Sequence, residues 1–256
     1  IIKAVSLTGR EQAGIAVATE AGKHLKKCVL ELGGSNAFII LEDANLEKAV
    51  EKAVNARMQN AGQSCIAAKR FLVQEKIVDE FVAKFKVAIQ NLKTGNPLDK
   101  ETQIGSLARV DLAEELELQV QKSIQMGAKL IVGGNRKEAF YEPTILTNVT
   151  TEMLVFKEET FGPVAAIITF KTIEEAIKLS NQSEFGLGVS IFTQDIDFIK
   201  TKISAFNEGA VFINDMVKSD PRLPFGGIKK SGYGRELAED GIKEFVNVKT
   251  VVINIL

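Results

Sequence analysis

Apolar residues recur along the chain with two alternating periods, one typical of strands and one typical of helices. Short apolar or β-branched runs predict strands over residues 71–73, 129–132, 140–146, 164–170, 187–193 and 210–214. Apolar positions spaced three and four apart predict helices over 11–23, 45–60, 77–93, 110–126, 173–181, 195–206 and 236–245. Strands that alternate with helices in this way favour an α/β fold, in which helices cover both faces of a mainly parallel sheet.

The first forty residues follow the same pattern with one anomaly. A β-like run over 1–9 stops at a glycine, and residues 28–40 divide into two strand segments at Gly33-Gly34. Glu31 lies inside the first of these apolar segments. A buried carboxylate costs free energy unless it is paired, so Glu31 is either a functional group or a side chain that points outward from a half-exposed strand.

The end of the chain, 246–256, alternates apolar and polar residues and predicts a strand. An apolar terminal strand needs an edge with which to pair, and a second subunit can supply one. We therefore expect a homo-oligomer, either a dimer or a tetramer.

Composition narrows the class of protein. The chain has 256 residues with 45% hydrophobic and 25% charged, which fits one or two globular domains. Its 32 basic and 33 acidic residues form no basic block, so no nucleic-acid partner is expected. No apolar run is long enough to span a bilayer and no leader is recognisable, so we expect a cytoplasmic protein without a membrane partner. Two cysteines and one histidine predict neither a disulfide framework nor a metal site.

The candidate chemistry centres on Cys65, which follows a glycine turn between a predicted helix and a predicted strand. A loop between regular elements can expose a reactive group while the scaffold holds it. Lys69 and Arg70 would favour the thiolate if they pointed inward, whereas the end of the preceding helix would oppose it. Cys28, within an apolar run, is interpreted as a buried structural thiol.

A nucleophilic cysteine needs a base. The only histidine, His24, lies in a lysine-rich stretch typical of a solvated surface, so a Cys-His hydrolase dyad is the weaker hypothesis. Glu31 is the better candidate base.

Three further motifs are weak alone. Thr8-Gly9 before a predicted helix suits a phosphate site or a structural turn. In the segment 158–163, a carboxylate can accept hydrogen bonds from sugar hydroxyls beside an aromatic ring, although a solvated acidic turn is the simpler interpretation. The glycine-rich loop 221–234, with Phe225, can wall an active site.

Taken in order, five motifs resemble the NAD(P)-dependent aldehyde dehydrogenase superfamily over essentially the whole chain. They are Leu7-Thr8-Gly9, Glu31-Leu32-Gly33-Gly34, Gly62-Gln63-Ser64-Cys65, 158–163 (Glu-Glu-Thr-Phe-Gly-Pro) and 224–232 (Pro-Phe-Gly-Gly-Ile-Lys-Lys-Ser-Gly). Residues 62–70 and 225–237 look most like the succinate-semialdehyde dehydrogenase branch.

The resemblance implies a role for each motif. Cys65 would attack the aldehyde to give a thiohemiacetal and then a thioester, its backbone N–H would stabilise the oxyanion, and Glu31 would activate the hydrolytic water. The cofactor would be NAD or NADP, bordered by Thr8, Gly9, Leu32, Glu159 and Phe161. Phe225 would line the substrate tunnel. For a short aldehyde that bears a carboxylate, such as succinate semialdehyde, Arg222 or Lys218 would be the carboxylate partners.

Two departures qualify the resemblance. Arg10 stands where family members commonly have serine. The chain also starts where the family's cofactor domain is nearly finished, so the upstream asparagine of the oxyanion hole and the residues that choose NAD or NADP are expected to lie outside it. We predict a remnant of the dinucleotide-binding domain at 1–31, a catalytic domain at 32–245 and an oligomerisation strand at 246–256. A cofactor-independent thiol esterase and an inert structural or interaction domain are the alternative hypotheses.

Overall fold

A seven-stranded sheet forms the centre of the computed structural model, which describes residues 2–255. Every neighbouring pair of its strands is parallel except the last pair, β8 and β5. The strand order is β12 (Val211–Ile213), β11 (Val189–Phe192), β3 (Asn36–Ile40), β4 (Ala68–Gln74), β9 (Val164–Phe170), β8 (Thr144–Thr147) and β5 (Lys129–Val132). This arrangement confirms the predicted α/β class with a mainly parallel sheet.

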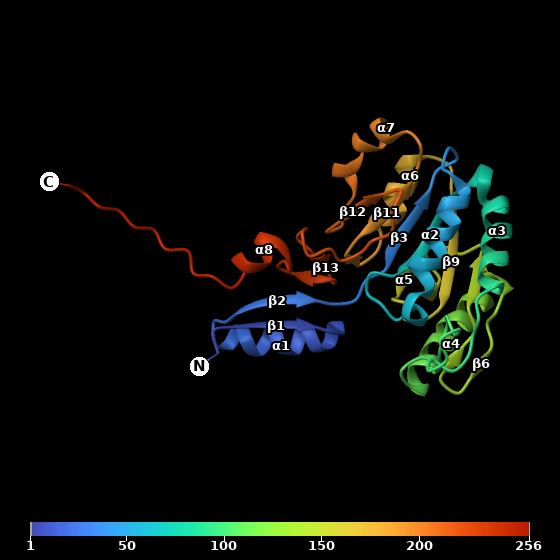
Figure 1. The fold of residues 1–256 in the computed structure, drawn as a ribbon, viewed down its shortest axis with the longest axis horizontal. Coiled ribbons are helices and arrows are strands. Elements are labelled where there is room, and N and C mark those ends of the chain that lie inside the picture. The colour runs from blue at the N-terminus through green and yellow to red at the C-terminus, as the bar shows by residue number, and fades with distance from the viewer. Residues whose placement is uncertain (1, 256) are drawn as a thin grey trace.

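Helices flank this sheet (Figure 1). The chain moves one way along the sheet from β3 to β4 and the opposite way from β9 to β11, so right-handed crossovers put the connecting helices on opposite faces. The helices are α2 (Leu46–Met58), α3 (Val78–Gln90), α4 (Val110–Gln125), α5 (Leu154–Lys157), α6 (Ile173–Asn181) and α7 (Ile196–Lys200). Stacked phenylalanines, including the pair Phe38 and Phe192 with ring centroids 4.6 Å apart, fill the core between sheet and helices.

A second, smaller unit lies beside the large sheet (Figure 1). Parallel strands β1 (Ala4–Thr8) and β2 (Lys27–Glu31) are joined by α1 (Glu11–Lys23), and β14 (Gly232–Tyr233) pairs antiparallel with β2. The unit has its own apolar cluster, to which Cys28 belongs with 8% of its surface exposed. The strand from residues 232–233 shows that the far end of the chain also contributes to the unit predicted at 1–31.

Local chemistry explains where the predicted elements differ from the observed ones. The strand predicted over 140–146 is interrupted at Pro143, which has no N–H for a ladder, and divides into β7 (Phe140–Tyr141), paired with β6 (Arg136–Lys137), and β8. The helix predicted over 195–206 ends at Lys200. There the Thr201 hydroxyl donates to the Phe198 carbonyl at 2.7 Å, and only a 3-10 turn, η3 (Ile203–Ala205), follows.

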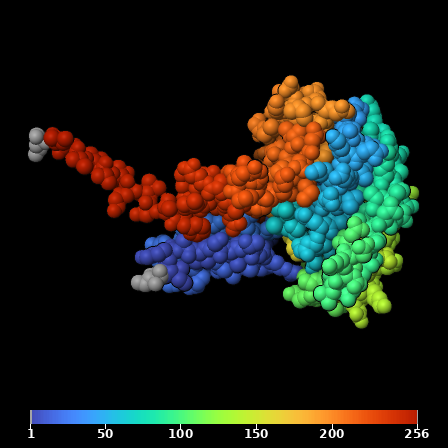
Figure 2. Space-filling view, in the orientation of Figure 1, coloured from blue at the N-terminus to red at the C-terminus, as the bar shows by residue number. Residues whose placement is uncertain are grey.

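The chain ends in an extended tail rather than a paired strand. After α8 (Ala238–Lys243), residues 246–255 form no strand and project away from the rest of the molecule (Figures 1 and 2). Apolar side chains along the tail are exposed, Val248 by 89% and Ile255 by 94%. The oligomerisation strand stays a prediction. Its last residue, Leu256, lies outside the described residues, as does Ile1 of the predicted first strand.

The remaining elements are short. They are two-residue strands β10 (Phe185–Gly186) and β13 (Ile228–Lys229), which pair with each other, and the 3-10 turns η1 (Gln59–Gly62) and η2 (Glu75–Ile77). Between residues 2 and 255, no helix combines the length and apolar character that a membrane crossing requires.

Candidate active site

Cys65 follows a strained turn at the end of α2. Asn60, Ala61 and Gly62 all adopt the left-handed conformation, with φ of 53°, 52° and 74°, which is costly for the two non-glycine residues. Fully buried Arg57 donates from Nη2 to the Gly62 carbonyl at 2.6 Å and holds the turn. A side chain at position 62 would overlap the carbonyl of Gly162, so the turn also packs tightly on the segment 158–163.

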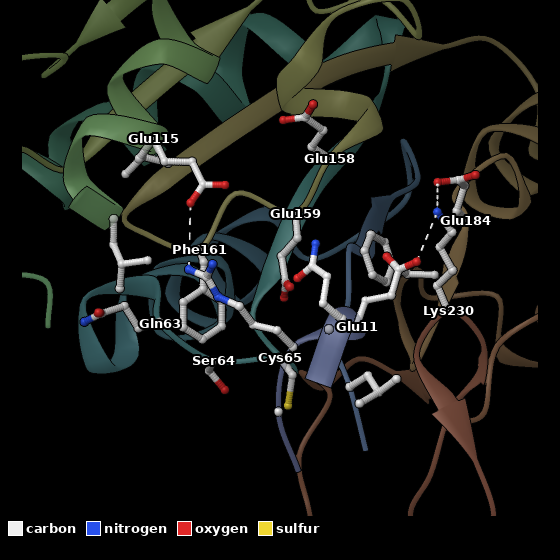
Figure 3. A pocket seen from close by; sticks show the side chains of 18 of the residues that line it. Glu11, Gln63, Ser64, Cys65, Glu115, Glu158, Glu159, Phe161, Glu184 and Lys230 are labelled. Carbon is white, nitrogen blue, oxygen red and sulfur yellow. Dashed lines mark hydrogen bonds and ion pairs between the residues drawn. The ribbon is translucent and has the colours of Figure 1, made fainter. Parts of the chain in front are cut away.

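The thiol faces a cavity of about 730 Å³ between the small unit and the large sheet. Figure 3 shows Gln63 and Phe161 on one side of this cavity, with Glu184 and Lys230 across from them. Six of the residues singled out in the sequence line it, namely Thr8, Gly9, Leu32, Cys65, Glu159 and Phe161. The fold therefore brings residues of all five sequence motifs to one cavity, since Gly33, Glu158 and Lys230 of the same motifs also line it.

Lys69 lies beneath the nucleophile and is fully buried. Its ammonium donates to the carbonyl oxygens of Ser64 and Cys65, at 2.8 and 3.0 Å, and to Oε1 of Glu159 at 3.0 Å. Of the two cations that follow Cys65 closely in the sequence, only Lys69 acts on the thiol. Arg70 instead donates to the carbonyls of Ser35, Leu179 and Ser180 and is structural.

Gly34, in the second motif, lets the backbone pack closely against Glu159 and Cys65. The Gly34 amide donates to Oε1 of Glu159 at 3.0 Å, and a Cβ at Gly34 would lie 2.5 Å from the Cys65 carbonyl oxygen. Any side chain at position 34 would thus push the nucleophile out of place.

Electrostatics around Cys65 act in both directions. Burial raises the pKa of the Cys65 thiol, and the carboxylates of Glu159 and Glu31 raise it further. The Lys69 ammonium lowers this pKa. The thiolate therefore depends on Lys69 for its principal side-chain stabilisation.

Glu31 ends strand β2 as a buried carboxyl with 2% of its surface exposed, and neither of its carboxyl oxygens has a hydrogen-bond partner among residues 2–255. Burial, helped by the negative charge of Glu236 and opposed by Arg235 and by the nearby backbone amide of Gly227, raises the pKa of Glu31 from 4.5 to about 7. Such a carboxyl can exchange a proton with water near neutral pH.

The position of Glu31 differs from that of the cavity-lining residues. A Cβ at Gly226 would lie 3.0 Å from its Oε1, so the carboxyl sits under the glycine-rich loop. Glu31 does not itself line the cavity, although its charge reaches the Cys65 thiol.

The sequence pattern that defines the aldehyde dehydrogenase family matches residues 1–251. The chain belongs to the aldehyde dehydrogenase family. Over 98% of its length it is 50% identical to succinate semialdehyde dehydrogenase [NAD(P)+] Sad of Escherichia coli K12, and equally to a probable succinate-semialdehyde dehydrogenase [NADP(+)] of Synechocystis.

A solved structure agrees with these sequence relatives. The NADP complex of glyceraldehyde-3-phosphate dehydrogenase GapN from Methanocaldococcus jannaschii superposes with a TM-score of 0.94 and 41% identity, covering 98% of this chain and 55% of that one. The chain spans 55% and 56% of the two curated relatives.

Within this aldehyde dehydrogenase chain, the three predicted substrate residues lie outside the cavity lining. Arg222 is 84% exposed and forms a two-fold ion pair with Asp220, and Lys218 pairs with Asp215. Phe225 exchanges backbone hydrogen bonds with Glu236. Their roles stay predictions.

His24, the candidate base of the alternative hydrolase, also lies outside the cavity lining. His24 caps the end of α1, where its exposed ring contacts Glu20, and it does not line the cavity. Nothing in the described residues joins it to Cys65.

Sequence reasoning missed several cavity residues because they come from elements far apart in the chain. Arg10 and Glu115 form an ion pair of 3.7 Å between the small unit and α4, shown as a dashed line in Figure 3. Glu11, Gln12, Gln119 and Glu184 also line this part of the cavity. The sequence did contain a signal for Arg57, because this charged residue lies among the apolar positions of the helix predicted over 45–60.

The raised pKa of Glu31 predicts a pH-dependent stability. Between pH 4.5 and about 7, Glu31 keeps its proton in the folded chain and has lost it in the unfolded chain. The contribution of Glu31 to the free energy of unfolding therefore falls as the pH rises through this range and is lost above about pH 7. Glu31→Gln should therefore raise the free energy of unfolding at pH 8 by about 1–2 kcal/mol and change it little at pH 4.5.

Denaturant unfolding of both proteins at the two pH values measures this difference. Glu239→Gln, an exposed glutamate on α8, is the control and should show no such change. An equal effect of Glu31→Gln at both pH values would contradict the raised pKa.

Proposed function

We propose that this chain is the nucleophile-bearing part of an enzyme that oxidises an aldehyde to a carboxylate with NAD or NADP. The proposal rests chiefly on Cys65, which lines one cavity together with Thr8, Gly9, Glu159 and Phe161. Membership of the aldehyde dehydrogenase family supports it.

The cavity suits the nicotinamide half of such a cofactor. The Glu159 side chain is 20% exposed, so its carboxylate can accept hydrogen bonds from ribose hydroxyls. Phe161 offers a flat apolar face, and Thr8-Gly9 precede the N-terminus of α1. When bound, the cofactor accepts the hydride that leaves the aldehyde carbon. The names of the two succinate-semialdehyde dehydrogenase relatives include NAD(P)+ or NADP(+), which supports this choice of cofactor.

Cys65 is the nucleophile of the proposed reaction. Its thiolate adds to the aldehyde carbonyl to form a thiohemiacetal, and loss of hydride leaves a thioester on the sulfur. The backbone N–H of Cys65 would donate to the oxyanion, while Lys69 holds the carbonyl on the other side of the same residue at 3.0 Å.

Glu31 would complete the cycle. With a pKa raised to about 7, its carboxylate can take a proton from the water that attacks the thioester, which releases the carboxylic acid and restores the thiol. Because the carboxyl lies under the Gly226-Gly227 loop, this step needs Glu31 to turn toward the thioester. At Gly226 no side chain stands against the carboxyl, where a Cβ would lie 3.0 Å from Oε1 of Glu31.

A short aldehyde with a terminal carboxylate, such as succinate semialdehyde, is the proposed substrate class. Its support is the 50% identity to two succinate-semialdehyde dehydrogenases, with Arg222 and Lys218 as proposed carboxylate partners. Arg222→Gln should raise the KM for succinate semialdehyde about tenfold and leave the KM for an uncharged aldehyde of similar length unchanged, since one ion pair is lost. Equal KM values for wild type and variant would remove Arg222 from the substrate site.

The activity is tested in two forms of the protein. The first is the chain itself, and the second is a completed enzyme, in which the part of the E. coli relative outside the match is joined to this chain. Each is incubated with succinate semialdehyde and NAD or NADP, and reduced cofactor is followed by absorbance, with the E. coli relative as positive control. Reduction by the completed enzyme supports the dehydrogenase.

An activated ester separates the alternatives. Ester hydrolysis that is lost in Cys65→Ala, without cofactor reduction in the completed enzyme, would indicate a thiol esterase. Neither activity in a completed enzyme that folds would indicate an inert structural or interaction domain.

A further inference from the structure

Three charged side chains are packed together behind the nucleophile, and their charges do not cancel. Arg57 and Lys69 are both fully buried cations, and Glu159 is the carboxylate that acts on each of them. Nε and Nη1 of Arg57 have no hydrogen-bond partner among residues 2–255. Two buried cations against one carboxylate leave one positive charge without a fixed counter-ion, beside a cysteine that can become an anion.

Lys69 is the member of the group that joins the site together. Its three hydrogen bonds reach the carbonyls of Ser64 and Cys65 on the nucleophile turn and the carboxylate of Glu159 on the segment 158–163. An ammonium has three donors, so these bonds occupy all of them and fix its direction. A single buried side chain thus sets the position of the turn relative to the proposed ribose-binding carboxylate.

We propose that Lys69 is a positioning residue for the reaction of Cys65, in which its buried ammonium both holds the nucleophile turn against Glu159 and supplies the positive charge that stabilises the thiolate. The role deepens the proposed function by naming the group that prepares the nucleophile. This role of Lys69 rests on the proposed function only in taking Cys65 as the nucleophile.

The charges that face the thiol support this assignment. They come from Lys69 on β4, Glu159 on the 158–163 segment and Glu31 at the end of β2, and Lys69 is the one cation among them. Burial lowers the pKa of Lys69 to about 8, with Arg57 lowering it further and Glu159 and Cys65 raising it, so the side chain keeps its positive charge at the pH of 7.5 used below for the rate comparison. Removing Lys69 should therefore raise the pH at which the thiol ionises, whereas removing the charge of Glu159 should lower it.

The test measures the thiol directly and needs neither aldehyde nor cofactor. Iodoacetamide alkylation of Cys65 is followed from pH 6 to 10 on the chain itself, and peptide mass spectrometry separates Cys65 from buried Cys28. The variants are Lys69→Met, which keeps the apolar stem but loses charge and donors, and Glu159→Gln. Lys93→Met, at an exposed lysine paired with Glu101, is the matched control.

We expect Lys69→Met to slow alkylation at pH 7.5 at least about tenfold and to move its midpoint upward by about one pH unit or more. Glu159→Gln should move the midpoint downward, and Lys93→Met should leave it unchanged. Faster alkylation of Lys69→Met with an unchanged midpoint would show that Lys69 only packs the turn, which overturns the electrostatic role.

Circular dichroism reports whether Lys69→Met folds. If it does not fold, Glu159→Gln still decides the matter, because a midpoint that stays or rises in that variant contradicts the proposed balance of charges. The dehydrogenase assay fails or succeeds independently, since alkylation reports the thiol and not turnover.

Discussion

Replacing Cys65 with alanine is expected to lower aldehyde oxidation by the completed enzyme at least about 10³-fold, because Cys65 is the one thiol among the described residues that line the cavity. Ser64 is adjacent, but its hydroxyl is far less acidic than a thiol. The rate of cofactor reduction at saturating aldehyde measures the loss. Binding of the cofactor should change little, since Cys65 contributes no charge to the cavity in its thiol form.

Cys28→Ala provides the matched control for this loss. Cys28 lies in the apolar cluster of the small unit and does not line the cavity, so its replacement should leave kcat unchanged. If Cys65→Ala kept full turnover, or if Cys28→Ala lost it, the nucleophile would have to be reassigned.

Glu31→Gln is expected to slow release of the product by about 10²- to 10⁴-fold while the first hydride transfer stays fast. A glutamine keeps the shape of the side chain but cannot take a proton from water. Rapid mixing should therefore show a burst of reduced cofactor that matches the number of active sites, followed by slow turnover. Without a burst, the slow step would precede the thioester, and Glu31 would not be its hydrolytic base.

A neighbouring glutamate gives a control with a different signature. The charge of Glu236 helps to raise the pKa of Glu31. In Glu236→Gln, the pH at which the rate of product release reaches half of its maximum should therefore fall below 7, while the maximal rate stays the same. Loss of the maximal rate in this variant would mean that Glu236 does more than tune Glu31.

The general architecture was predictable because hydrophobic period follows from local geometry. The helix over 11–23 and the strands over 129–132 and 164–170 have the predicted bounds. The terminal strand 246–256 was not found as a strand in residues 246–255, because no other strand among the described residues pairs with this segment. Helix 195–206 was predicted too long because the spacing of apolar residues did not separate α7 (Ile196–Lys200) from the 3-10 turn η3 (Ile203–Ala205) that follows it.

The site was predictable where residue type alone limits the chemistry. Cys65 stood out as a thiol on a turn, whereas Glu159 was singled out only by the resemblance to the family, and both line the cavity. The inward direction of Lys69 was not predictable, because it depends on the packing of β4 against the 158–163 segment. The exposure of Arg222 and its pairing with Asp220 are likewise products of the folded loop.

The most direct test of the account is the mass of the Glu31→Gln completed enzyme after one encounter with succinate semialdehyde and cofactor. We predict that the protein gains the mass of a succinyl group and that peptide mapping places this group on Cys65 alone. No gain in mass while a burst of reduced cofactor is observed, or a succinyl group on another residue, would contradict the proposal that Cys65 carries the thioester and Glu31 removes it.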